Sequence, residues 1–274
     1  MDRLADFRSV FADAVCARGA CRDPRIREAF ARVPRHEFVE RGPWRFAEDG
    51  LPSASVDPAL LYQDLALGLA PDRGITTGLP SLHARCLDAC APRLGESVVH
   101  VGAGAGYFTA ILAELVGPSG AVRAFEIDAL LAATAERNLA RWSQITVQAR
   151  SAIDAEGPVD LIYVCAGAQQ VPSAWRRALR PGGRLSLPLT PGDSEGAVLL
   201  VKHVDREHYE ARFVTPARFV PCVGATDRDA EELLRRAFAR GDGASVRSLR
   251  VAPEPPDSSC WFAGDGWWLS SSGP

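Results

Sequence analysis

The stretch VVHVGAGAGYFTAILAELVG, from Val98 to Gly117, places three glycines at alternate positions between an apolar strand-like run and a helix-like run. A turn that leads from a strand into a helix needs glycine where its backbone must approach a ligand closely. Gly102, Gly104 and Gly106 meet this need. Glu126, near the end of the next apolar run, is placed to accept hydrogen bonds from two ribose hydroxyls. The turn and the acid together predict a site for a nucleoside-containing cofactor.

The spacing of the glycines separates two kinds of cofactor. Dinucleotide sites favour GxGxxG because a pyrophosphate docks on the helix N-terminus, whereas GxGxG is the commoner form for S-adenosylmethionine, which has no phosphate. This chain has the shorter period, because Gly106 follows Ala105 directly. The spacing therefore favours S-adenosylmethionine over NAD. The alternative is a tight turn that holds no ligand, in which Glu126 would be a solvated charge.

The elements around this turn alternate between helix and strand from Leu79 onward. The pattern predicts helices over 80–91, 108–116, 130–141 and 173–179, and strands over 97–101, 121–127, 145–149, 159–165 and 184–188. Near-continuous apolar strands such as VDLIYVC are typical of parallel strands buried on both faces. We therefore expect an α/β fold, a Rossmann-like doubly wound and mostly parallel sheet with helices on both faces.

The two ends of the chain follow other patterns. Two short helices are expected in the first forty residues, the second one starting at Asp23-Pro24, and residues 41–60 read as an irregular loop that could cover a site. After about Leu189 we expect antiparallel strands, an amphipathic helix over 229–241 and a hairpin around Asp265-Gly266. The tryptophans of this hairpin, Trp261, Trp267 and Trp268, could pack the sheet or shape a pocket. The division expected is a helical lead-in with a cover loop (1–60), a cofactor-binding core (61–190) and an α+β C-terminal extension (191–274).

Composition excludes several classes of partner. The chain has a net charge of −3, is 47% hydrophobic and 24% charged, and lacks the basic stripe that nucleic-acid binding requires. Its N-terminus lacks a signal-peptide core and no segment has the length of an apolar membrane span, so we expect a cytoplasmic protein without a membrane partner. Its seven cysteines show neither a CxxC pair nor zinc-ligand spacing. We expect reduced thiols and no metal.

Several segments, taken in order, resemble one known family. They are DPRIREAFARVPRHEFV, YQDLAL, VVHVGAGAGYFTAILAELVGPSG, the acid in VRAFEID, and VDLIYVCAGAQQVPSAWRRALRPGGRLSLPL. Together they resemble the protein-L-isoaspartate O-methyltransferases, a family of class I S-adenosylmethionine-dependent methyltransferases, over about residues 5–190. The VPRHEFV lead-in makes the resemblance specific, because it is not part of the general class I pattern.

The resemblance implies roles for individual residues in binding S-adenosylmethionine. It implies that the three glycines line the methionine and ribose side and that Glu126 binds the ribose hydroxyls. It also assigns to the cofactor site Tyr107 and Ile127, which adjoin these residues, and two residues that depart from the family pattern. Ser151 stands where the family usually has an Asp near the adenine, and His100 stands where an acidic residue is usual.

The acceptor side departs further from the family. An ungapped match of GITTGLPSLHA to the family's Thr-Ile-Ser-x-Pro pattern puts Gly78 at the position of a serine that lies near the acceptor carboxylate. Thr76, Thr77 and Ser81 are the nearby hydroxyls that could replace it. Alternatively, they cap the helix that begins at about Pro80. The chain therefore resembles an atypical member of the family.

Three functions remain open at this point. The resemblance implies O-methylation of an isoaspartyl carboxylate, a group that is already ionised at neutral pH and needs no general base. A specialised methyltransferase of a peptide natural product or a small carboxylic or hydroxylated metabolite is the alternative, and a hydroxyl acceptor would make His83, His36 or His100 the first candidates for a base. A noncatalytic protein that binds S-adenosylmethionine or peptides is the third. The acceptor and the oligomeric state stay open.

Overall fold

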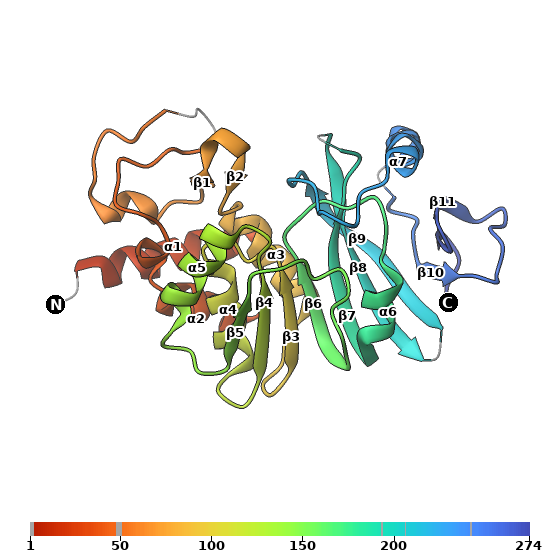
Figure 1. The fold of residues 1–274 in the computed structure, drawn as a ribbon, viewed down its shortest axis with the longest axis horizontal. Coiled ribbons are helices and arrows are strands. Elements are labelled where there is room, and N and C mark those ends of the chain that lie inside the picture. Colours follow the sequence, from red (N-terminus) through yellow and green to blue (C-terminus); the bar gives the residue numbers. More distant parts are fainter. Residues whose placement is uncertain (1–2, 48–50, 193, 206, 242) are drawn as a thin grey trace. The chain divides into compact units, whose positions relative to one another are not determined.

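The computed structural model describes residues 3–47, 51–192, 194–205, 207–241 and 243–274 (Figure 1). The chain forms two compact units. The first comprises the residues up to Glu96 together with Ala103–Arg150, and the second comprises Ser97–Gly102 together with the residues from Ser151 onward. The three-part division expected at residues 60 and 190 stays a prediction, since it divides the chain by function rather than by compactness.

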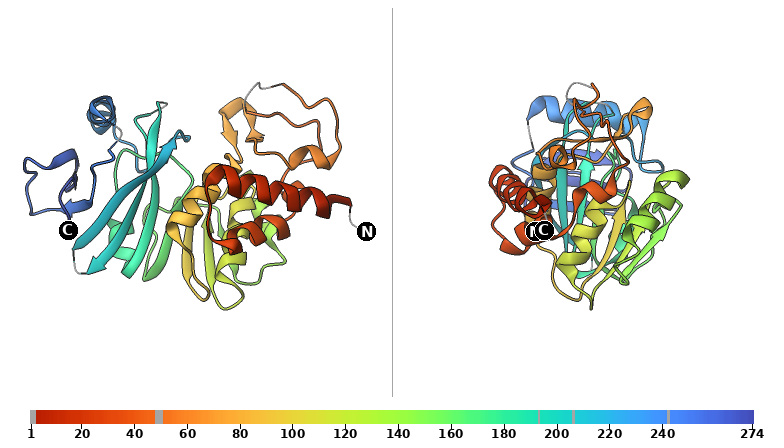
Figure 2. Two further views of the ribbon diagram at one scale, coloured as in Figure 1. Left: turned by 180° about the vertical axis from the view of Figure 1, so that it is seen from behind. Right: turned by 90° about the vertical axis from the view of Figure 1, so that its left-hand side faces the viewer.

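The first unit begins with two helices, α1 (Arg3–Gly19) and α2 (Pro24–Arg32), that pack side by side (Figure 2). Asp23 caps α2, because its carboxylate accepts a hydrogen bond from the backbone N–H of Arg25 at 2.9 Å and Pro24 takes the first helical position. The apolar face of α2 is buried. This confirms the two short helices expected in the first forty residues.

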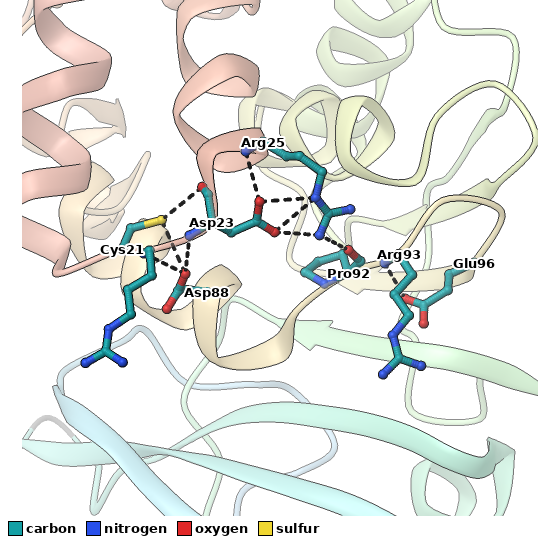
Figure 3. Close-up of polar contacts among 8 residues, drawn as sticks. Cys21, Asp23, Arg25, Asp88, Pro92, Arg93 and Glu96 are labelled. Carbon is teal, nitrogen blue, oxygen red and sulfur yellow. Dashed lines mark hydrogen bonds and ion pairs between the residues drawn. The ribbon is translucent and has the colours of Figure 1, made fainter.

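A carboxylate on α3 (Pro80–Cys90) holds the turn between α1 and α2 in place (Figure 3). Asp88 Oδ1 accepts hydrogen bonds from the backbone N–H groups of Arg22 at 2.8 Å and of Asp23 at 2.9 Å. Arg25 donates both to the Asp23 carboxylate, from Nε at 3.1 Å, and to the carbonyl of Pro92 at 2.9 Å. The lead-in helices are thus tied to α3 and to the segment that follows it.

The rest of the first unit contains short elements before α3 and alternating helices and strands after it. Its elements are η1 (Arg35–Phe38), η2 (Pro58–Leu61), β1 (Gly68–Ala70), η3 (Pro71–Arg73), β2 (Ile75–Thr76), α3, α4 (Tyr107–Val116), β4 (Ala121–Phe125), α5 (Ala129–Leu139) and β5 (Ile145–Gln148). Strands β4 and β5 pair in parallel, and β1 and β2 pair antiparallel. The expected loop at 41–60 has isolated bridges and ends in η2 over its described residues, while 48–50 lie outside them.

The second unit is built on a mixed sheet. Its elements are β3 (Ser97–Val101), β6 (Val159–Val164), α6 (Ser173–Ala178), β7 (Leu179–Leu189), β8 (Gly196–Asp205), β9 (His208–Ala217), α7 (Arg228–Arg240), β10 (Ser248–Val251), β11 (Cys260–Gly264) and β12 (Trp267–Ser270). The strand order is β11-β12-β10-β9-β8-β7-β6-β3. Strands β3, β6 and β7 pair in parallel, whereas every pairing from β7 to β11 is antiparallel.

Burial explains why the strands of the second unit lie where the sequence predicts them. Leu161 and Ile162 of β6 and Leu185 and Leu187 of β7 are fully buried, as expected for strands covered on both faces. The predicted hairpin around Asp265-Gly266 is confirmed as β11 and β12. Its tryptophans at 267 and 268 are each 2% exposed and donate their indole N–H groups to Gln170 and to the carbonyl of Glu254, so they pack the sheet.

Candidate cofactor and acceptor site

The three glycines of the turn all adopt the left-handed conformation, with φ values of +76° for Gly102, +56° for Gly104 and +98° for Gly106. A side chain is strained at such φ values, so the glycines are required by the backbone itself. Gly106 is the N-cap of α4, and its N–H donates to the carbonyl of Ala103 at 2.9 Å. Gly102 belongs to the second unit, and the turn from Ala103 onward belongs to the first.

Glu126 lies directly after β4 and holds the glycine turn. One carboxylate oxygen accepts the backbone N–H of Gly104 at 2.7 Å, and the other accepts that of Asp128 at 3.0 Å. The side chain is 8% exposed. A carboxylate offers about four lone-pair sites, so about two remain for other donors. Glu126 can therefore bind two ribose hydroxyls and at the same time stabilise the turn, a second role that the sequence did not indicate.

Two neighbours extend this part of the site. Asp128 caps α5 through hydrogen bonds from the N–H groups of Leu130 and Leu131, each at 2.9 Å, and forms an ion pair with Arg73. The helix N–H groups and the Arg73 guanidinium lower the pKa of Asp128. Ile127 lies between Glu126 and Asp128 in the chain and is 54% exposed, so its apolar side chain is accessible for packing against the ring of a ligand.

Tyr107, the first residue of α4, is 4% exposed and lies among aromatic side chains. Its ring packs edge-on against Phe30 of α2 and Phe38 of η1, and the Arg35 guanidinium lies 5.9 Å from the ring centroid. Burial raises the pKa of its hydroxyl, for which the described residues supply no hydrogen-bond partner. Tyr107 thus joins α4 to the lead-in, and its contact with a cofactor stays a prediction.

His100 and Ser151 belong to the second unit. His100 is 1% exposed, its Nε2 lies 3.2 Å from Cys165 Sγ, and burial lowers its pKa to about 3. A ring that takes up a proton so poorly is a weak general base, which argues for a structural role at the end of β3. Ser151 Oγ accepts the N–H of Ile153 at 3.2 Å and is half-buried. The roles expected for both residues toward the cofactor stay predictions.

The hydroxyls expected near the acceptor are engaged in local structure. Thr77 Oγ1 accepts the N–H of Leu67 at 3.0 Å and donates to the carbonyl of Gly78 at 3.2 Å, and Thr76 Oγ1 accepts the Gly78 N–H at 3.2 Å. The alternative that these hydroxyls cap α3 is wrong, because the helix has no side-chain cap and Asp64 accepts the Ser81 N–H instead, at 2.8 Å. Acceptor roles for Thr76, Thr77 and Ser81 stay predictions.

Arg35 is a buried cation that the sequence did not single out. Only 1% of it is exposed, and it donates to the carbonyls of Leu61 at 2.8 Å and Gln63 at 2.7 Å. It also donates to Thr77 Oγ1 at 3.4 Å. The sequence feature that could have identified Arg35 is its position in the VPRHEFV segment. Arg35 therefore links the lead-in to the segment that carries the hydroxyls.

The residues present fit S-adenosylmethionine. A Cβ added at Gly104 would lie 3.1 Å from Leu69 Cδ1, and one at Gly102 would lie 3.3 Å from the carbonyl oxygen of Cys165, so a side chain at either position would require its neighbour to shift. The acid beside it keeps acceptor capacity for a ribose. All seven cysteines are thiols outside disulfide bonds, and no group of three ligating side chains that could hold a metal ion occurs among the described residues. Within the same part of the chain, no helix has the length and apolarity to span a bilayer.

Comparisons with known proteins identify the family of the chain. A family model described as protein-L-isoaspartate(D-aspartate) O-methyltransferase matches residues 9–227. Over 212 residues the chain is 34% identical to a protein-L-isoaspartate O-methyltransferase of Methanopyrus kandleri, covering 75% of this chain and 86% of that protein. A Pyrobaculum neutrophilum protein of the same name is 32% identical over 209 residues, covering 74% and 92%.

Solved structures show the same fold. A protein-L-isoaspartate O-methyltransferase superposes with a TM-score of 0.67 at 20% identity, covering 97% of this chain and 88% of the other. A Plasmodium falciparum structure, described as a candidate enzyme of that kind in complex with S-adenosyl-L-homocysteine, has a TM-score of 0.64 at 17% identity and covers 78% and 97%. The Rossmann-like α/β fold expected from the sequence is confirmed.

Proposed function

Because the chain belongs to the protein-L-isoaspartate(D-aspartate) O-methyltransferase family, we propose that it transfers the methyl group of S-adenosylmethionine to the side-chain carboxylate of isoaspartyl residues in proteins or peptides. The observation that carries this proposal is the Glu126 carboxylate, held against the left-handed glycine turn by the Gly104 N–H at 2.7 Å. That turn and acid lie within the matched residues. The cofactor expected from the sequence follows from the family.

S-adenosylmethionine supplies a methyl carbon bound to a positively charged sulfur. In this chain the glycine turn and Glu126 bind the nucleoside part, and Ile127 offers an apolar surface beside it. The family resemblance is the support for cofactor-binding roles of Ser151 and His100. An ionised carboxylate acceptor needs no proton removed, so the residues on the acceptor side have to orient it and exclude water. The weak basicity of His100 is compatible with such chemistry.

A second candidate is a specialised methyltransferase acting on a peptide natural product or a small carboxylic or hydroxylated metabolite. Gly78 supports it, because the family's serine hydroxyl is absent from the acceptor side. The cytoplasmic location expected from the sequence stays a prediction under either function.

The deciding experiment measures S-adenosylhomocysteine formation with an isoaspartyl peptide and with its aspartyl counterpart. Turnover of the isoaspartyl form alone supports the proposal. Turnover of neither peptide, with normal binding of S-adenosylhomocysteine, contradicts it and directs the search to natural-product and metabolite acceptors. If no acceptor supports turnover, the chain is a noncatalytic binder. A Glu126→Gln variant serves as the control for turnover that does not arise from this site.

A further inference from the structure

The position that lacks the family's serine is filled by a histidine ring. Gly78 has a φ of +77°, and a Cβ built on it would lie 2.5 Å from Nε2 and 3.1 Å from Cδ2 of His83. Real Cβ atoms essentially never approach another heavy atom to less than 3.0 Å. The nitrogen-bearing edge of the imidazole therefore occupies the space that a side chain at position 78 would enter. Gly78 and His83 are a matched pair in this chain.

The packing around His83 holds the ring in this position. It lies on α3, is 2% exposed, and stacks on Phe108 of α4 with ring centroids 3.7 Å apart and planes 23° apart. Phe108 is the second residue of α4, so this contact places the imidazole beside the helix that starts at the glycine turn. The hydrogen bonds of Asp88 fix α3 from its other end (Figure 3). A ring stacked and buried in this way is rigid.

The other two histidines suggested as catalytic groups are placed elsewhere. His36 Nδ1 lies 2.6 Å from the hydroxyl of Tyr62, and His100 is buried beside Cys165 in the second unit. His83 is the histidine whose ring lies against the position of the absent hydroxyl.

We propose that His83 takes over the acceptor-binding role of that hydroxyl, with the Nε2 N–H donating a hydrogen bond to the acceptor carboxylate. The inference rests on the proposed function. One carboxylate oxygen forms the new C–O bond while the C–S bond breaks with its electron pair going to sulfur, and no proton is transferred. His83 holds the other oxygen and keeps its own proton throughout. An imidazole N–H can donate to a carboxylate as a hydroxyl does, so Gly78 need not abolish carboxyl methylation.

The test compares His83→Leu, which keeps an apolar contact with Phe108, with His83→Gln, which keeps an N–H donor of similar reach. With an isoaspartyl peptide, His83→Leu should lower kcat/KM by about 10- to 100-fold, the loss of a hydrogen bond to a charged group, while His83→Gln stays within about threefold of wild type. S-adenosylhomocysteine affinity and the melting temperature are measured for each variant. His208→Gln, at an exposed histidine of the second unit, is the control.

A double variant, Gly78→Ser with His83→Val, returns a hydroxyl to position 78 and frees the space that the ring fills, although serine is strained at a φ of +77°. Where its melting temperature shows that it folds, it should regain part of the activity that His83→Leu loses. Full activity of His83→Leu, or equal losses in the folded Leu and Gln variants, would overturn the proposal. A wild-type rate that rises with pH through a step missing in His83→Gln would also overturn it, because His83 would then act as a base. Absence of wild-type turnover with any carboxylate acceptor would instead refute the proposed function, and the role of His83 with it.

Discussion

Replacing Glu126 tests the cofactor site most directly, because this carboxylate has two roles with different readouts. In the structure it accepts backbone N–H groups from Gly104 at 2.7 Å and Asp128 at 3.0 Å, and it retains acceptor capacity for two ribose hydroxyls. A hydrogen bond to a charged group contributes about 1.5–3 kcal/mol. Glu126→Ala should therefore cost at least about 3 kcal/mol of binding free energy, which weakens S-adenosylhomocysteine binding by about 100-fold or more.

The same variant should also lower the free energy of unfolding, by about 1–3 kcal/mol, because two backbone N–H groups lose a charged acceptor. Glu126→Gln keeps one amide oxygen for one of these N–H groups but turns an NH₂ group toward the other. Glu126→Gln should bind S-adenosylhomocysteine with an affinity between those of wild type and Glu126→Ala. Its free energy of unfolding should exceed that of Glu126→Ala by at most about 1 kcal/mol.

Isothermal titration calorimetry with S-adenosylhomocysteine gives the affinity, and urea unfolding gives the stability. Glu136→Gln, at an exposed position of α5 in the same unit, is the matched control and should bind like wild type. Native-like unfolding of Glu126→Ala together with an affinity within about twofold of wild type would refute the assignment of Glu126 to the cofactor site.

Three further predictions concern the turn, the lead-in and pH. Gly106→Ala should lower the free energy of unfolding more than Gly74→Ala does. Both positions have positive φ and lose about 1–2 kcal/mol to strain, but only at position 106 would the new Cβ lie 2.9 Å from a leucine methyl. Equal losses in urea unfolding would contradict this prediction. Arg35→Met should cost about 3 kcal/mol in urea unfolding and lower kcat/KM, since buried carbonyls lose their donor; wild-type stability would show that these bonds contribute little. Burial lowers the pKa of His100 from 6.5 to about 3, so between these pH values the unfolded chain binds a proton that the folded chain does not. The free energy of unfolding should therefore fall with acidification by up to about 1.4 kcal/mol per pH unit. His100→Gln should remove this contribution to the pH dependence, and an unchanged pH dependence would contradict the prediction.

Local patterns made most of the elements predictable. Asp23-Pro24 marks the start of α2 because an N-cap and a first-turn proline act on neighbouring residues alone. The hairpin between β11 and β12 follows from Asp265-Gly266 for the same reason. Strand β7 was expected over 184–188 and extends over Leu179–Leu189, because its ends are set by pairing with β6 and β8 rather than by its own residues. The short strand β10 was missed, since four residues carry too weak a pattern.

The candidate site divides in the same way. The GxGxG turn could be recognised from the sequence because left-handed backbone demands glycine whatever surrounds it. Three features could not be recognised in this way: the hydrogen bonds of Glu126 to the turn, the burial of Arg35 among carbonyls, and the hydrogen bond between Thr77 and Leu67. Each joins residues 10 to 26 positions apart, so no short sequence pattern contains both partners.

The amino-acid sequence was sufficient to determine the family, the cofactor class and the absence of a side chain at position 78, since each is written in residue types and short spacings. The tertiary structure alone decided what fills that position. His83 lies on α3, and its ring stacks on Phe108 of α4. This contact between the two helices holds the ring nitrogen against Gly78. Side-chain direction in a packed core depends on neighbours that local sequence does not name, which is why a histidine on a helix face could not be assigned to the acceptor from its spacing.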